Sequence, residues 1–185
     1  FLGGGALYFH LEPQHAIIND INSKLMAFYA GVRDNYEQVR KDLDFIESLY
    51  TANRSEFDRL KTLTPNERVA DENEDLYYAI RDMFNGLKRS KYTDAAVYYF
   101  INKTAYSGMI RYNAKGEFNV PFGRYKNLNT SFVTEQHSNL LQQTDIYNED
   151  YRAIFAMAQE DDFMFLDPPY DCVFPTMGMK STRMA

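Results

Sequence analysis

Short apolar runs that suit buried strands occur near both ends of this chain, and a long helical pattern lies between them. The first run covers residues 16–19 and ends at Asp20, while the last covers residues 163–166 and leads into Asp167. Short runs that are apolar throughout are typical of strands in a parallel sheet, which is covered on both faces. The pattern therefore predicts an α/β fold in which an insertion of about 110 residues interrupts the sheet.

Length, hydrophobicity and cysteine usage exclude several classes of protein. The 185 residues suffice for one domain with a core, or for one domain that carries an insertion. No apolar stretch approaches the roughly 20 residues of a membrane helix, and residues 1–5 do not resemble a secretory signal. One cysteine, Cys172, and three scattered histidines exclude a disulfide framework and predict no metal site. We therefore expect a metal-free protein of the cytoplasm.

A glycine-rich segment precedes the first predicted strand. Gly3, Gly4 and Gly5 allow the backbone to approach a ligand closely, because no Cβ is in the way. Asp20 follows at the tip of the strand, near the spacing of roughly 20 residues that suits a carboxylate on ribose hydroxyls. This order, with a helix over residues 21–32, predicts a nucleotide-binding half. Since a glycine loop needs a strand that leads into it, we also expect a segment upstream of Phe1.

The residues between the two α/β pieces have a helical pattern with polar outer faces. A break at residues 63–66 separates a first helical stretch from helices predicted over residues 76–87 and 95–102. Further along we predict a helix over residues 131–142, a strand that ends at residues 145–147, and a helix over residues 150–159. One apolar stripe of the first stretch is expected to pack inside, namely Val39, Leu43, Ile46, Leu49 and Tyr50.

A basic segment rich in aromatic residues covers residues 102–127. It holds five basic residues and one acid, so the net charge of −6 divides into +4 here and −10 elsewhere. Cations interleaved with aromatic rings are what phosphate contact and base stacking require. Such rings are equally at home in a core, and such charges on a solvated face, so the segment alone leaves both interpretations open.

The last apolar run ends in Asp167-Pro168-Pro169-Tyr170. Each proline fixes its own φ and favours an extended residue before it, so the carbonyl groups here point in a defined direction. Ligands of open α/β sheets bind at the carboxyl ends of strands, where this tip can grip a planar amine. The alternative is that Asp-Pro-Pro simply ends a strand.

These segments together resemble Dam-like DNA adenine-N6 methyltransferases of the D12 class, group alpha. Residues 1–5 match the Phe-x-Gly-x-Gly cofactor loop of that family, residues 19–22 its next strand tip, and residues 167–170 its catalytic motif. Residues 106–113 and 116–125 are similar to its DNA-recognition hairpin almost residue for residue. The resemblance covers residues 1–174. It implies a partial Rossmann-like core, S-adenosylmethionine as methyl donor and double-stranded DNA as substrate.

The resemblance also implies roles at the reacting amine and at the cofactor. The lone pair of the adenine amine is delocalised into the ring, so Asp167 and the Pro168 carbonyl would accept its hydrogens and push electron density back. Pro169 belongs to the same motif, and Tyr170 would stack on the base, which must be flipped out of the duplex to meet the methyl donor. The residues implied at the cofactor are Phe1, Gly3, Gly5, Asp20, Asp150, Tyr151 and Asp167.

The hairpin is implied as the DNA-binding element. Arg111 would bind a guanine edge in the major groove, where a bidentate arginine contributes about 1 to 3 kcal/mol of discrimination. Tyr106 would enter the base stack, Met109 and Pro121 would add apolar contacts, and Arg124 and Lys126 would hold phosphates. The full expected set is Tyr106, Met109, Arg111, Asn119, Pro121, Arg124, Tyr125 and Lys126.

The expected organisation has four parts. Residues 1–33 and 144–174 form the cofactor-binding and catalytic parts of the core, and residues 34–143 form a largely helical recognition insertion with a hairpin over 105–126. Residues 175–185 lose all periodicity, and we interpret them as an atypical tail that is out of frame. Because the family has strands before Phe1 and after Tyr170, we expect an incomplete fragment that is marginally stable and has little activity alone. We also expect a monomer.

The predicted function is site-specific methyl transfer to adenine N6 in duplex DNA by base flipping. Two alternatives stay open. The first is a DNA-binding remnant that keeps recognition through Arg111 and Tyr106 without catalysis. The second is an amino-methyltransferase that acts on RNA or on a protein amide.

Overall fold

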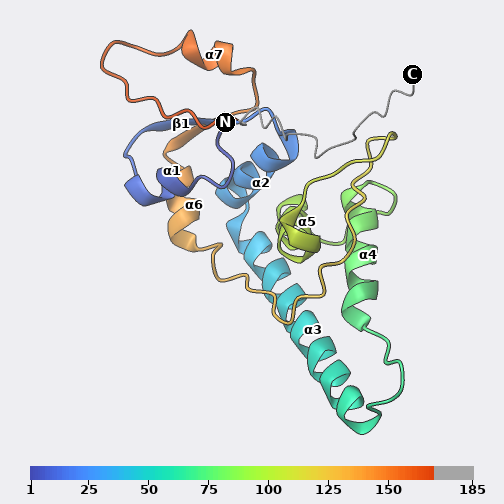
Figure 1. The fold of residues 1–185 in the computed structure, drawn as a ribbon. Coiled ribbons are helices and arrows are strands. Elements are labelled where there is room, and N and C mark those ends of the chain that lie inside the picture. Colours follow the sequence, from blue (N-terminus) through green and yellow to red (C-terminus); the bar gives the residue numbers. More distant parts are fainter. Residues whose placement is uncertain (169–185) are drawn as a thin grey trace, which may run out of the picture.

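The computed structural model describes residues 1–168, in which a small sheet with short helices adjoins an arm of longer helices (Figure 1). Both ends of the described chain lie in the sheet region, and the middle of the chain forms the arm. The predicted mixed α/β pattern, with a sheet built from the two ends of the chain, is therefore confirmed at this level.

Two parallel strands make up the sheet within the described residues. β1 (Ala16–Asn19) pairs with β2 (Thr144–Tyr147), with Ala16 opposite Thr144 and Asn19 opposite Tyr147. The Asn19 side chain locks the carboxyl ends together, since its Nδ2 donates to the Glu149 carbonyl at 3.0 Å and its Oδ1 accepts from the Glu149 amide at 2.8 Å. The runs predicted at 16–19 and 145–147 thus lie side by side.

Three helices cover the sheet region: α1 (Ala6–Leu11), α2 (Ser23–Asp34) and α6 (Glu135–Leu141). α2 begins at Ser23, later than the predicted residue 21, because the Asn22 side chain accepts from the Leu25 amide at 3.2 Å and caps the helix. In the same way Thr134 caps α6 through the His137 amide at 3.2 Å, which excludes residues 131–134 from the predicted helix.

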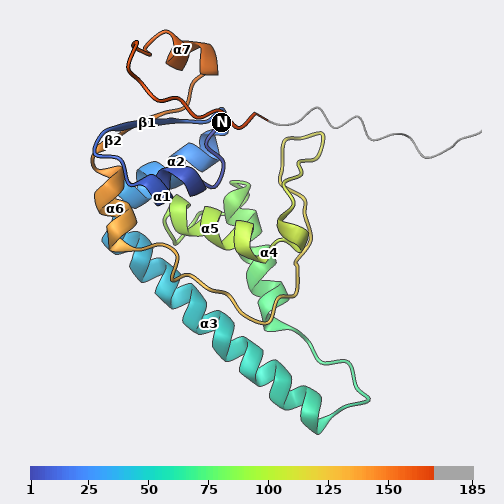
Figure 2. The same cartoon turned by 60° about the vertical axis from the view of Figure 1, so that its left-hand side comes forward.

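The arm consists of α3 (Tyr36–Leu63), α4 (Glu72–Phe84) and α5 (Asp94–Thr104) (Figure 2). α3 has 28 residues and therefore extends about 42 Å. The predicted stripe of α3 is buried at Val39, Leu43, Ile46 and Tyr50, while Leu49 is half-buried. α5 is buried along most of its length. It also packs closely against α2 at Gly31. A Cβ added to Gly31 would come within 2.9 Å of the Ala95 Cβ, so no larger residue fits there without a shift.

Residues 105–122 form an antiparallel hairpin that returns along the arm. Bridges join Ala105 to Phe122 and Tyr112 to Phe118. A short 3-10 turn, η1 (Tyr106–Gly108), lies at the start of the first of its two antiparallel segments. The core cluster includes Phe118 and Phe122, which are buried, so part of the aromatic content of the basic segment is indeed core.

Two predictions about the C-terminal third are wrong. Residues 163–166 form no strand, and Phe163, Phe165 and Leu166 are 78%, 57% and 46% exposed. A strand needs backbone hydrogen bonds to a neighbour, and residues 163–166 pair with neither β1 nor β2. The helix predicted over 150–159 is also shorter, since α7 covers Tyr151–Phe155.

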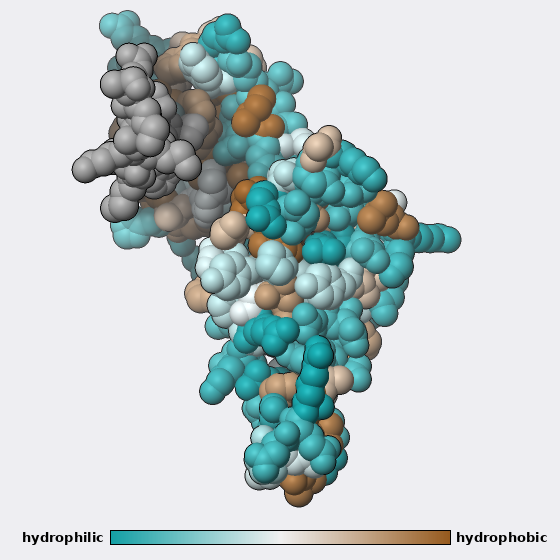
Figure 3. Space-filling view, turned by 45° about the vertical axis from the view of Figure 1, so that its right-hand side comes forward, coloured by the Kyte–Doolittle hydropathy of each residue, from teal (hydrophilic) through white to brown (hydrophobic). Residues whose placement is uncertain are grey.

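The surface of the face drawn in Figure 3 is mainly hydrophilic, with apolar side chains in separate spots. No helix of the described residues combines the length and apolarity needed to cross a membrane.

Candidate functional site

The glycine segment forms a loop that the carboxylate of Asp20 holds in place. Asp20 Oδ2 accepts from the amides of Leu2 at 3.0 Å and Gly3 at 3.2 Å, and Oδ1 accepts from the Asn22 amide at 2.9 Å. Gly3 and Gly5 have φ values of 55° and 65°, in the left-handed region that favours glycine. Asp20 therefore shapes the loop itself. About four acceptor positions belong to a carboxylate, so about one is left for a ligand.

Asp20 comes directly after β1, and a second pair of predicted residues follows β2. Asp150 caps α7 through the Arg152 amide at 2.9 Å and pairs with the Arg152 guanidinium at 2.8 Å. These hydrogen bonds to Arg152 lower the pKa of Asp150 to about 2. The Asp150 carboxylate is therefore negatively charged at neutral pH, and its oxygens are bound to Arg152.

The rings of Phe1 and Tyr151 stack on each other, with centroids 5.6 Å apart and planes at 28°. The two predicted cofactor residues are thus brought together from opposite ends of the described chain. A third ring between them would need a separation of about 7 Å, two contact distances of about 3.5 Å each. A planar group at this place therefore stacks on an outer face or requires a ring to turn.

A cavity of about 630 Å³ opens beside the glycine loop, between α2, α5 and the start of the hairpin. That size is within the range of small-molecule sites. Gly3 and Asp20 line it, while Phe1, Gly5, Asp150, Tyr151 and Asp167 do not. The other walls combine aromatic rings with a few polar groups: Phe28, Tyr98, Tyr99, Phe132, Asn102, Lys103 and His137. Burial raises the pKa of Tyr98, so its hydroxyl stays protonated at neutral pH.

The predicted catalytic tip is described only in part. Asp167 and Pro168 are exposed, and Pro169 and Tyr170 lie outside the described residues. In both ribbon views the red end of the coloured chain passes beside the N-terminal end (Figures 1 and 2). The last described residues therefore lie near the glycine loop, although Asp167 does not line the cavity.

The hairpin presents the predicted DNA-binding side chains at its surface. Tyr106, Met109 and Arg111 are exposed, as are Pro121 and Lys126. The guanidinium of Arg111 donates from Nε to Asn119 Oδ1 at 2.8 Å and from Nη2 to the Asn119 carbonyl at 3.1 Å.

Arg124 and Tyr125 have partners within the protein. Arg124 pairs with Glu74 of α4 at 3.1 Å, and the Tyr125 hydroxyl accepts from the Ser107 amide at 3.1 Å. Tyr125 is 40% exposed and its contact braces the turn after Tyr106. Both side chains thus help to shape the hairpin.

Three tyrosine hydroxyls attach residues 120–129, which form the end of the hairpin and the segment just after it, to the helices. Tyr50 of α3 donates to the Tyr125 carbonyl at 2.5 Å, Tyr77 of α4 to Val120 at 2.8 Å, and Tyr99 of α5 to Asn129 at 2.9 Å. Burial raises the pKa of Tyr50, Tyr77 and Tyr99 to about 12. The sequence marked Tyr50 only as a core position, and nothing in the pattern pointed to its hydroxyl.

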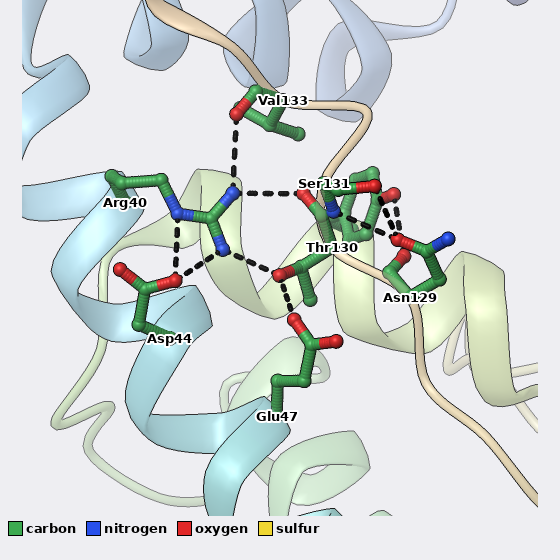
Figure 4. Close-up of polar contacts among 8 residues, drawn as sticks. Arg40, Asp44, Glu47, Asn129, Thr130, Ser131 and Val133 are labelled. Carbon is green, nitrogen blue, oxygen red and sulfur yellow. Dashed lines mark hydrogen bonds and ion pairs between the residues drawn. The ribbon is translucent and has the colours of Figure 1, made fainter.

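Arg40 of α3 makes a fourth attachment, on the segment behind the hairpin (Figure 4). Its Nη1 donates to the carbonyls of Thr130 at 2.8 Å and Val133 at 3.1 Å, and its Nη2 donates to the Thr130 hydroxyl. The Thr130 hydroxyl in turn donates to Glu47 of the same helix. Sequence reasoning missed this clamp, because 90 residues separate Arg40 from Thr130 and neither belongs to a motif.

Comparison with known proteins indicates the family of this chain. The family model described as D12 class N6 adenine-specific DNA methyltransferase matches residues 1–180. The chain belongs to this family. Among curated relatives, the type II methyltransferase M.MjaIII of Methanocaldococcus jannaschii is 35% identical over 98% of this chain. M.CviBI of Paramecium bursaria Chlorella virus NC1A is 32% identical over 96%, and the DNA adenine methylase of Salmonella typhi is 30% identical over 92%.

This D12-class chain spans 60% of the length of the first two relatives and 54% of the Salmonella protein. The described residues contain no group of three or more His, Cys, Asp or Glu side chains placed to hold a metal ion. The family assignment agrees with the resemblance that the motifs indicated.

Proposed function

We propose that the protein containing this chain transfers a methyl group from S-adenosylmethionine to adenine N6 in duplex DNA, on a Rossmann-like core. The observation that carries the proposal is the proximity of the Asp20-held glycine loop, the cavity and the exposed hairpin. The cavity is lined by Gly3 and Asp20 at one side and by Ile110 of the hairpin at the other. A ligand held at the loop is therefore close to the element that would bind DNA.

The residues present fit the cofactor. A Cβ placed on Gly3 or Gly4 would meet no atom within 4 Å, so the loop faces open space where a ligand can approach the backbone. Asp20 would use its remaining acceptor position for a ribose hydroxyl, and Phe1 and Tyr151 would offer an outer ring face to the adenine. S-adenosylmethionine supplies the electrophilic methyl group.

On the DNA side, Arg111 would bind a guanine edge, and Tyr106 would fill the space of a flipped base. Asp167 and the Pro168 carbonyl would accept the amine hydrogens, with Pro169 and Tyr170 completing the tip. Met109, Asn119 and Pro121 would lie along the groove, and Arg124, Tyr125 and Lys126 along the backbone. Holding the amine in line with the methyl group would contribute proximity, and no covalent nucleophile is required.

Mapping N6-methyladenine in DNA from cells that express the full-length protein tests this function. We expect methylation at one short sequence, its loss in Asp167→Asn, and its retention in the nearby control Asp161→Asn. Arg111→Ala should keep methylation but spread it to related sequences. DNA without N6-methyladenine would overturn the proposal. If the purified protein also binds duplex DNA without binding S-adenosylmethionine, the DNA-binding remnant is the correct alternative.

A further inference from the structure

A compact basic loop follows α4 and lies outside every motif discussed above. Residues 86–91 read Gly-Leu-Lys-Arg-Ser-Lys, with three cations and no acid. The loop has a defined start, since Gly86 has a φ of 71° and its amide donates to the Met83 carbonyl at 3.0 Å, while the Leu87 amide donates to Asp82 at 2.9 Å. These two bonds form a Schellman end, which fixes the direction in which the loop leaves the helix.

Two of its cations have no acidic partner among residues 1–168. Lys88 pairs with Asp82 at 2.8 Å, whereas Arg89 and Lys91 are exposed and make no ion pair there. Cations near a helix C-terminus often compensate the helix dipole, but that effect is confined to the last turn. Lys88, Arg89 and Lys91 all lie beyond the last turn of α4, which ends at Phe84, so the helix dipole accounts for none of them. Lys91 lies over the Tyr92 ring, 5.1 Å from its centroid, but neither Arg89 nor Lys91 is neutralised by an acid of the described residues, which is notable in a chain of net charge −6.

The base of the loop sits between the cofactor side and the hairpin. Lys24, near the start of α2, donates to the Phe84 carbonyl at 2.9 Å. On the other side, the Asn85 side chain donates to the Phe118 carbonyl at 3.0 Å and accepts from the Phe118 amide at 2.8 Å. It thus binds both backbone groups of Phe118, as the backbone of a paired strand would. The loop therefore leaves the protein where the glycine-loop side meets the recognition hairpin.

We propose that Arg89 and Lys91 bind backbone phosphates of the same duplex whose bases the hairpin contacts. This inference rests on the proposed function. A duplex that lies on the hairpin and delivers a base toward the glycine loop passes this junction, and it carries one negative charge per about 1.7 Å of its axis. Contacts of this kind add affinity and fix orientation, but carry no sequence information. The loop thus extends the DNA-binding surface from the hairpin onto the end of α4.

The test compares Arg89→Ala/Lys91→Ala with Lys61→Ala/Arg68→Ala in the full-length protein. Lys61 and Arg68 are exposed and lie at the far end of α3, so the control removes the same two charges at a distance from the hairpin. Dissociation constants for cognate and unrelated duplexes are measured over a range of salt concentrations. We expect the loop variant to weaken both complexes equally and to lower the salt slope by about 1.8, that is about 0.9 per phosphate contact. The control should keep the wild-type slope, and Arg89→Lys/Lys91→Arg should retain it as well.

The outcomes separate the two proposals. A loop variant with the slope and affinity of the control overturns this inference and leaves the proposed function standing. A loss confined to the cognate duplex also overturns it, because phosphate contacts do not discriminate between sequences. A wild-type protein that binds no duplex overturns the proposed function and this inference together.

Discussion

Asn119 contacts the guanidinium of Arg111 with both of its oxygens, the side-chain oxygen at Nε and the backbone carbonyl at Nη2. These contacts occupy one edge of the planar group. The other edge, with Nη1 and the second Nη2 hydrogen, makes no hydrogen bond within the described residues and has the parallel donor geometry that a guanine edge accepts. Asn119 therefore orients the side chain that we propose as the base contact.

Asn119→Ala should reduce base discrimination more than overall affinity. It removes one bond to a charged but exposed group, so we expect a loss of about 1 kcal/mol, roughly fivefold, at the base that Arg111 contacts. Competition binding with single-base variants of the cognate duplex measures this loss. Asn66→Ala, an exposed asparagine near the far end of α3, is the control. An equal loss against every duplex would show that Asn119 acts on affinity alone.

Arg40→Ala should destabilise the protein by about 2 kcal/mol. The substitution leaves the carbonyls of Thr130 and Val133 without this donor, and both of these residues are buried. Arg54 is a matched control, because it lies on the same helix, has a side chain 20% exposed against 19% for Arg40, and pairs with an aspartate four residues on. Arg54→Ala should cost about 0.5 kcal/mol or less. Urea unfolding measures both, and equal costs would refute the role of the clamp.

The hydroxyls of Tyr8 and Thr144 lie 2.6 Å apart and join α1 to β2. The Thr144 hydroxyl donates to the Leu140 carbonyl at 3.1 Å, so Tyr8 is the donor in the pair. Tyr8→Phe should therefore cost about 1 kcal/mol, since Thr144 keeps its other bond. Thr144→Val strands a buried Tyr8 hydroxyl and should cost up to about 3 kcal/mol. In unfolding experiments the double variant should be more stable than Thr144→Val alone, and strict additivity would contradict this account.

Alkaline pH should release the hairpin. The ordinary tyrosine pKa is 10, and the pKa of Tyr50, Tyr77 and Tyr99 is raised to about 12 by burial. Between these values the unfolded chain loses protons that the folded chain keeps, so stability is complete below pH 10 and falls as pH rises toward 12. A tyrosinate also cannot donate to a carbonyl. Unfolding midpoints over this range should decline less steeply in Tyr77→Phe than in the wild type, and identical slopes would contradict the prediction.

The local sequence pattern was enough to predict those helices and strands that periodicity alone identifies. The buried stripe of α3 follows from residues three and four apart, and the runs at 16–19 and 145–147 contain enough apolar residues to identify β1 and β2. The same logic failed for residues 163–166, because an apolar run becomes a strand only beside a neighbour. Caps moved helix ends by a few residues, as Asn22 and Thr134 show.

For the candidate site, the sequence supplied expected residues but no geometry. The family resemblance named Asp20 and Arg111 as site residues. The structure adds that most acceptor positions of Asp20 bind amides of the glycine loop and of Asn22, and that Asn119 binds the guanidinium of Arg111. Contacts between positions far apart in sequence, such as Arg40 with Thr130 or Phe1 with Tyr151, leave no periodic signal. They follow only from the three-dimensional arrangement.

The hydroxyls of Tyr50, Tyr77 and Tyr99 all donate to backbone carbonyls of residues 120–129, at the end of the hairpin and just after it, and Arg40 binds two more carbonyls further along the chain. Because every amino acid has a backbone carbonyl, these contacts place almost no restriction on the side chains of the hairpin. The side chains that we propose as DNA contacts can therefore be exchanged while the helices keep their contacts with the backbone. Under the proposed function, such an attachment would let target specificity diverge, by natural selection or by design, without loss of the contacts that hold the hairpin.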